Sequence, residues 1–189
     1  MEIKMAGIDY SLTCPCVAIY CGEADRFSFE DCRFFYLIGT DKYCETYHNG
    51  IIWGDEMPDW KTDEERYDRI SAWVIDILTK NEIESVFIEG YSMGSKGRVF
   101  NLAENCGVLK HKIWKRKIEI EIVAPTAVKK YATGKGNSDK EKMHESFVAE
   151  TGVDLQKEIC PDKGKVGSPV GDIVDAYYIL KYGVESGNN

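Results

Sequence analysis

Two short apolar runs in this chain each end in a carboxylate, and this feature constrains the fold most. Residues 3–8 lead to Asp9, and residues 85–88 lead to Glu89. A strand buried on both faces should not end in an acid without reason, because burying an unpaired charge is costly. If the two runs are parallel neighbours, their ends lie about 4.8 Å apart. The sequence therefore predicts two carboxylates side by side at one end of a central sheet.

A second acidic pair lies in residues 171–182, which form the last predicted helix. Asp172 and Asp175 are three residues apart, so on a helix they share a face. Asp175 stands within an apolar run, where a buried helix face would be expected to carry an apolar side chain. Taken singly, Asp9 is equally well explained as a loop residue or helix N-cap, and Asp172 as a first-turn acid that complements the helix dipole.

Four carboxylates that converge repel one another strongly unless a cation neutralises them, and hard divalent cations accept oxygen ligands. Two such ions about 3.5–4 Å apart activate a water and stabilise the leaving oxygen of a phosphodiester. We therefore expect two Mg²⁺ ions, with Mn²⁺ able to substitute. The predicted metal ligands are Asp9, Glu89, Asp172 and Asp175. This pattern is typical of a magnesium-dependent nuclease.

The remaining elements follow from periodicity and capping signals. Three short β-rich runs with short connections favour an antiparallel meander, at residues 3–9, 16–21 and 33–38. Two later runs, 85–89 and 118–123, alternate with helical patterns at 63–80 and 99–115. Ser138-Asp139-Lys140-Glu141 offers a capping box for a helix that Gly152 terminates. Residues 39–61 show no period and are expected to be irregular, with at most a short strand at 50–53.

This order predicts an α/β protein with a mixed five-stranded sheet, an antiparallel meander followed by parallel strands, flanked by helices. It is the order of the ribonuclease H-like fold. A chain of 189 residues is the right size for a single domain, so we expect residues 1–189 to form one.

Composition restricts the setting and the partners. The net charge of −8 weighs against non-specific coating of nucleic acid, but residues 110–117 and 129–142 carry clustered positive charge. Seven cysteines, an odd number, do not suggest a disulfide framework, and Cys14-Pro15-Cys16 has the wrong spacing for a zinc site. No apolar run is long enough to span a membrane, and the charged start does not suggest a signal peptide. We expect a cytoplasmic location, in a host cell if the chain is viral.

The chain resembles the RuvC family of Holliday junction resolvases, metal-dependent nucleases of the ribonuclease H-like superfamily. The resemblance runs in family order through Gly7-Ile8-Asp9, Ile88-Glu89, residues 124–129, residues 134–140 and Asp172-x-x-Asp175-Ala176. It implies that the four acids are the catalytic metal ligands. It also implies that Lys129 and Lys140 act near the scissile phosphate and along the DNA backbone, with Lys140 part of the catalytic machinery.

The resemblance implies further DNA contacts and a partner. The loop after Glu89 supplies Tyr91, which could stack on an opened base, with Lys96 and Arg98 as backbone contacts. Lys135, between Gly134 and Gly136, is expected to contact DNA as well. Family members act as homodimers on four-way junctions. Phe100 and Trp114 fall off the apolar stripe of their helix and could pack on a partner.

Other functions fit parts of the pattern. The same metal chemistry could serve RNA–DNA hybrids, flaps or replication forks, because loops and dimer geometry select the substrate. A non-catalytic binder of branched DNA would be expected to lack some of the acids. An actin-like phosphotransferase would need more glycine-rich phosphate loops and a longer chain. The leading hypothesis is a structure-selective endonuclease, a crossover junction endodeoxyribonuclease that resolves four-way junctions.

Overall fold

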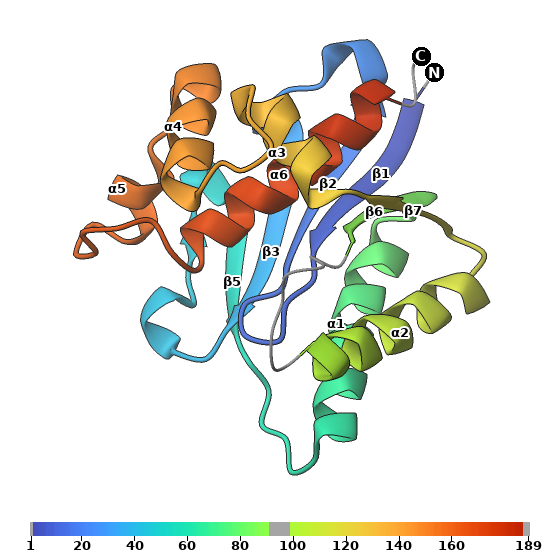
Figure 1. The fold of residues 1–189 in the computed structure, drawn as a ribbon. Coiled ribbons are helices and arrows are strands. Elements are labelled where there is room, and N and C mark those ends of the chain that lie inside the picture. Colours follow the sequence, from blue (N-terminus) through green and yellow to red (C-terminus); the bar gives the residue numbers. More distant parts are fainter. Residues whose placement is uncertain (1, 91–98, 187–189) are drawn as a thin grey trace.

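The computed structural model describes residues 2–90 and 99–186. Within these ranges, seven strands form one mixed sheet in the order β4-β5-β3-β2-β1-β6-β7 (Figure 1). The strands are β1 (Glu2–Asp9), β2 (Cys16–Glu23), β3 (Cys32–Ile38), β4 (Thr46–Tyr47), β5 (Ile52–Glu56), β6 (Ser85–Glu89) and β7 (Glu119–Val123). β2 is antiparallel to β1 and β3, whereas β1, β6 and β7 run parallel. The predicted ribonuclease H-like fold, with a meander followed by parallel strands, is confirmed.

The sheet has seven strands within the described residues rather than the predicted five, and segment 39–61 is more regular than expected: the short strand expected at 50–53 overlaps β5, whereas β4 was not predicted. This segment carries β4 and β5; β5 pairs in parallel with β3, and β4 forms the edge of the sheet. The Phe34 amide donates to the Ile51 carbonyl at 2.8 Å, and the rings of Phe35 and Trp53 stack across the two strands with centroids 4.9 Å apart. Such cross-strand pairing is not visible as a period within the segment itself.

Helices cover both faces of the sheet. They are α1 (Asp63–Lys80), α2 (Val99–Lys115), α3 (Pro125–Thr133), α4 (Lys140–Thr151), α5 (Leu155–Ile159) and α6 (Val170–Ser186). α1 and α2 lie on one face, and α6 lies along the other with α3 and α4 beside it (Figure 1). Two apolar cores result, one centred on the packing of α1 against β1, β2 and β6, and the other on α6.

Two glycines, which have no side chain, let α6 approach the sheet closely. A Cβ atom at Gly7 of β1 would overlap the backbone of Ala176 and Leu180, and one at Gly183 of α6 would overlap the ring of Phe87 on β6. Backbone contact at these positions sets both the depth and the direction of the helix. Because Gly7 lies two residues before Asp9, the first turns of α6 are placed over the end of β1.

The helix boundaries follow their caps, with two corrections. α4 begins after Asp139, whose carboxylate accepts from the Lys142 amide at 2.9 Å. The predicted capping residue, Ser138, instead donates to the Lys135 carbonyl at 3.0 Å. α3 was not predicted, although a proline at the first turn and Gly134 in the left-handed conformation are ordinary helix limits. None of the described helices has the length and apolar character that crossing a bilayer requires.

Candidate active site

The ends of β1 and β6 bring Asp9 and Glu89 together. Ile8 pairs with Ile88 in the parallel register, so the two acids are the next residues along neighbouring strands. β6 is also paired with β7, where Glu89 lies opposite Val123, and this fixes its strand end on the other side. The predicted adjacency of the two carboxylates is therefore present in the fold, because parallel strands that pair in register end together.

Asp172 and Asp175 lie in the first two turns of α6, over the same end of the sheet. Asp172 is only 5% exposed, the most buried carboxylate among the described residues. Ala176, one turn after Asp172, lies against Gly7, so this part of α6 is directly above β1. The four predicted acids therefore come from three distant segments and meet where the sheet and α6 converge.

The four acids lie close enough together that their charges act on the pKa values of Asp9 and Asp175. Burial raises the pKa of Asp9 well above its usual range, and the charges of Asp175, Asp172 and Glu89 raise it further. Burial likewise raises the pKa of Asp175, to about 7, with Lys140 opposing the shift. The pKa of Glu89 is raised by burial, while nearby Lys129 and Lys140 act to lower it. Burial therefore favours the protonated forms of Asp9, Glu89 and Asp175.

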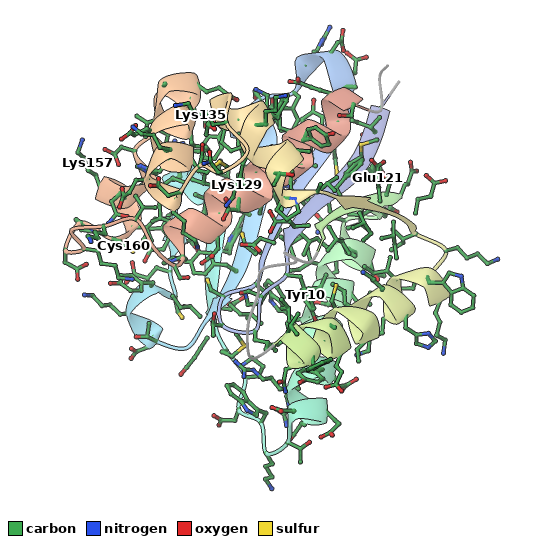
Figure 2. All side chains as sticks on the ribbon, in the orientation of Figure 1. Tyr10, Glu121, Lys129, Lys135, Lys157 and Cys160 are labelled. Atoms are coloured by element: carbon green, nitrogen blue, oxygen red, sulfur yellow. The ribbon has the colours of Figure 1, made fainter. Side chains whose placement is uncertain are left out.

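Two of the predicted basic residues face this cluster. The Lys140 ammonium lies 2.8 Å from Asp172 Oδ1, and its side chain is 44% exposed against 7% for that of Asp172. Lys140 also acts on Asp9 and Asp175, while Lys129 of α3 acts on Glu89 and Asp175. The four acids are thus bordered by two positive charges on the side of α3 and α4. Figure 2 labels Lys129 on this side of the sheet.

Two thiols complete the wall of the site, and sequence reasoning did not find them. Cys16 pairs directly with Asp9 in the antiparallel register of β1 and β2, and it is fully buried. The Cys14 thiol lies close to Asp172, and both burial and this carboxylate raise its pKa. The signal that would have found them is the short connection between β1 and β2, which fixes the pairing of Asp9 with residue 16.

The carboxylates are not arranged as a ready-made metal cage. Among residues 2–90 and 99–186, no three carboxylate, thiol or imidazole groups are close enough together to hold one ion as they stand. Asp172 Oδ2 is buried, and no donor in the described part of the chain meets the geometry of a hydrogen bond to it. An all-oxygen donor set with an unsatisfied buried oxygen suits a hard divalent cation, once the side chains have rotated toward it.

The other predicted DNA contacts are placed differently. Tyr91, Lys96 and Arg98 lie outside the described residues. Lys135 is exposed in the turn between α3 and α4, beside a hollow of about 310 Å³ that Thr133, Asn137 and Lys142 also line. Lys135 therefore belongs to the outer surface beside the site rather than to the acidic cluster itself, and Figure 2 shows it beyond Lys129.

Comparison with solved structures places the fold. Thermus thermophilus RuvC in complex with a Holliday junction substrate matches with a TM-score of 0.63 and 15% identity, over 98% of this chain and 96% of that one. The fowlpox virus resolvase with Holliday junction DNA matches with a TM-score of 0.55 and 13% identity, over 99% and 100%. The yeast mitochondrial Holliday junction resolvase matches with a TM-score of 0.52 and 14% identity, over 96% and 78%. At these identities the likeness is one of fold.

The sequence itself carries the family relationship. A search of curated proteins gives no match. The model of the family described as crossover junction endodeoxyribonuclease RuvC matches residues 44–164, which is more than half of the chain. This segment contains Glu89, Lys129 and Lys140, while Asp9 and the two acids of α6 lie outside it. The chain belongs to the RuvC family of crossover junction endodeoxyribonucleases.

Proposed function

We propose that this protein is a metal-dependent endonuclease that resolves four-way DNA junctions. The observation that carries the proposal is the meeting of Asp9, Glu89, Asp172 and Asp175 at one end of the sheet, with Lys129 and Lys140 beside them. Family membership and the fold shared with two resolvases solved with junction DNA support the same conclusion.

The four acids would hold two Mg²⁺ ions, and Mn²⁺ would substitute. When bound, such ions supply an activated water and stabilise the leaving oxygen of the cleaved phosphodiester. The buried, unsatisfied Asp172 Oδ2 and the oxygen-only acidic set fit this assignment. Asp9 and Asp175, whose pKa values are raised by burial, would have to give up their protons to serve as ligands.

The lysines supply the complementary charge. Lys129 and Lys140 lie on the side of α3 and α4, where their ammonium groups can hold a phosphate and offset negative charge that grows during bond breaking. Lys135 extends this positive border along the backbone of the DNA. The protein surface therefore positions the phosphate, while the shape of the branched substrate is selected elsewhere.

A symmetric dimer would provide that selection, and α2 offers a surface for it. Its outer face carries a stripe of exposed residues, Phe100, Glu104, Gly107, His111 and Trp114, with Phe100 and Trp114 77% and 69% exposed. The stripe is nearly symmetric about Gly107. In an antiparallel pair of α2 helices, Phe100 would face Trp114 of the other copy, and Glu104 would face His111. Gly107, with open space where a Cβ would lie, would allow close approach.

Cleavage assays on matched substrates test the function. The purified protein, with Mg²⁺ or Mn²⁺, should cut a synthetic four-way junction into two nicked duplexes by paired, symmetric incisions. A flap, an RNA–DNA hybrid and a linear duplex of the same sequence should be cut far more slowly. Equal rates on all substrates would refute junction selectivity, and preference for a flap or hybrid would support the related nuclease activities. Junction binding without cutting in either metal would identify a non-catalytic binder.

A further inference from the structure

The Lys140 ammonium is bound to Asp172, one of the carboxylates that would serve as metal ligands. Asp172 is the most buried acid of the cluster, and one of its oxygens is bound to the Lys140 ammonium at 2.8 Å. No donor within the described residues meets hydrogen-bond geometry with the other oxygen, although the Cys14 thiol lies close to this carboxylate. In the same arrangement, the acids are not gathered closely enough to share one ion. The structure is therefore that of a site closed on an internal cation.

The backbone of α6 makes room for this lysine. A Cβ atom at Gly171 would lie 2.8 Å from Lys140 Cδ, 3.1 Å from Nζ and 3.3 Å from Cε. The lysine stem thus runs across the surface of Gly171 to reach the next residue, Asp172. Any larger residue at this position would displace the stem, because carbon atoms do not approach one another this closely.

The two partners differ in their freedom to move. The side chain of Lys140 is 44% exposed and starts from the first residue of α4, whereas that of Asp172 is 7% exposed in the core of α6. The more exposed lysine is therefore the partner that rotates toward solvent more readily. Rotation of Asp172 away from the site would bury its charge elsewhere.

We propose that Lys140 is an exchangeable counter-ion that competes with the divalent cation for Asp172, and that Gly171 is the positioning residue that holds it there. The inference rests on the proposed function, since it concerns the same acids. In the metal-free protein Lys140 neutralises Asp172, and it leaves when a metal ion binds. The released ammonium is then available to a DNA phosphate, so that metal loading and substrate binding share one lysine.

The exchange is tested by measuring the affinity for Mn²⁺ in the absence of DNA. The electron paramagnetic resonance signal of the free ion reports how much Mn²⁺ is bound. Lys140→Met keeps the stem but removes the competitor, so Mn²⁺ should bind about ten- to a hundredfold more tightly. Lys142→Met, in the same helix and paired with exposed Glu145, should leave the affinity unchanged. Circular dichroism establishes that each variant is folded.

Two further variants distinguish the direct contact of Lys140 with Asp172 from a general effect of nearby positive charge. Lys129→Met removes a nearby positive charge that, within the described residues, makes no ion pair with Asp172, and it should tighten Mn²⁺ binding no more than about threefold. Gly171→Ala keeps the lysine but obstructs its path, and it should also tighten binding. Gly164→Ala, at a glycine with no neighbour within 4 Å of the added Cβ, is its matched control.

The outcomes are distinguishable. Tighter binding in both Lys140→Met and Gly171→Ala supports the exchange, even though cleavage falls in the lysine variant. Unchanged affinity in folded Lys140→Met, or an equal gain in Lys129→Met, overturns it while the wild-type protein still binds Mn²⁺ and cuts junctions. Should Lys140→Met fail to fold, unchanged affinity in folded Gly171→Ala overturns it. Absence of Mn²⁺ binding and of cleavage in the wild-type protein would overturn the proposed function as well.

Discussion

Asp9 and Glu89 directly follow Ile8 and Ile88, which face each other across the parallel strands β1 and β6. The two carboxylates therefore lie at the ends of adjacent strands, although they are far apart in the sequence. Hydrogen bonds of the sheet hold this spacing, so the acids are placed by rigid structure rather than by a loop. Burying these carboxylates costs free energy, and nearby positive charge reduces that cost.

Replacing Glu89 with Gln should abolish cleavage without unfolding the protein. The substitution removes ligand charge but keeps shape, so cleavage of a four-way junction should fall by at least about a hundredfold. Junction affinity in Ca²⁺ should stay within about threefold of wild type. Single-turnover cleavage and gel-shift titration measure the two quantities. Glu121→Gln, on the exposed side of neighbouring β7, is the matched control and should cut normally. Loss of the folded state in Glu89→Gln would instead indicate a structural role.

Asp175 should make the metal-free protein less stable as pH rises. Its pKa of about 7 in the folded state lies above the ordinary value of 3.8, so the folded state binds the proton more tightly than the unfolded state. Stability is therefore lost as pH rises from about 4 to 7, and the loss is complete above 7. Asp175→Asn removes this penalty and should stabilise the chelator-treated protein by about 1–4 kcal/mol at pH 8, with the gain shrinking toward pH 4.

Thermal unfolding at several pH values with a chelator measures this effect. Divalent cations should reverse the order at pH 8, because they stabilise only the protein that keeps its ligand. An Asn variant that is less stable than wild type at pH 8 without metal would show that the carboxylate is already satisfied by its surroundings.

Much of this architecture could be predicted from the sequence, for specific physical reasons. The helix at 63–80 has a strong apolar stripe and a Thr62 cap, and its predicted limits match α1. The strands that carry Asp9 and Glu89 were predictable because acids at the ends of apolar runs are unusual. By contrast, β4 and β5 depend on pairing with β3, and the ion pair of Lys140 with Asp172 joins residues 32 positions apart. Local patterns contain no information on such contacts.

The predicted role of Lys135 can be tested by salt dependence. Lys135→Ala should weaken junction binding about uniformly across sequences and reduce the slope of log affinity against log salt by about 0.9. Lys157→Ala is the control, since Lys157 is an exposed lysine on α5 that pairs with Asp154 and lies well to the side in Figure 2. Fluorescence anisotropy at several salt concentrations gives both slopes. Equal slopes in wild type and Lys135→Ala would exclude a phosphate contact.

A charge on the outer face of α2 should dissociate the proposed dimer. Trp114→Glu places a carboxylate against Phe100 of the other copy, so the protein should sediment as a monomer at micromolar concentration. Ile122→Glu, at an apolar residue that is 47% exposed on β7, is the control and should leave the association state unchanged. Analytical ultracentrifugation distinguishes the species. A wild-type protein that is itself monomeric, with and without junction DNA, would rule out the α2 pairing.

His48, which lies between β4 and β5, should stabilise this edge of the sheet at low pH. Its Nδ1 lies 3.0 Å from Glu158 and its Nε2 lies 3.2 Å from Glu30. Burial acts to lower the pKa of His48, but the hydrogen bonds to Glu158 and Glu30 outweigh burial and raise it. The contribution is therefore full below about pH 6.5 and is lost as pH rises through the folded-state pKa. His48→Gln should cost about 0.5–1 kcal/mol at pH 6 and less at pH 9.

Urea unfolding at the two pH values measures this difference. A cost that is the same at both values would assign the role of His48 to packing against Phe29, whose ring centroid is 5.2 Å away.

The two glycines at the contact between α6 and the sheet limit how this enzyme can change. Gly7 brings the main chain of β1 against the main chain of α6, and Gly183 brings the main chain of α6 against the Phe87 ring, so neither glycine can be replaced by a smaller residue to bring the helix closer. Laboratory evolution toward another cation or another DNA shape will therefore accumulate substitutions in the connections at 10–15 and 134–139. The position of α6 on the sheet will stay fixed, because variants at either glycine will misfold before their catalytic activity can be selected.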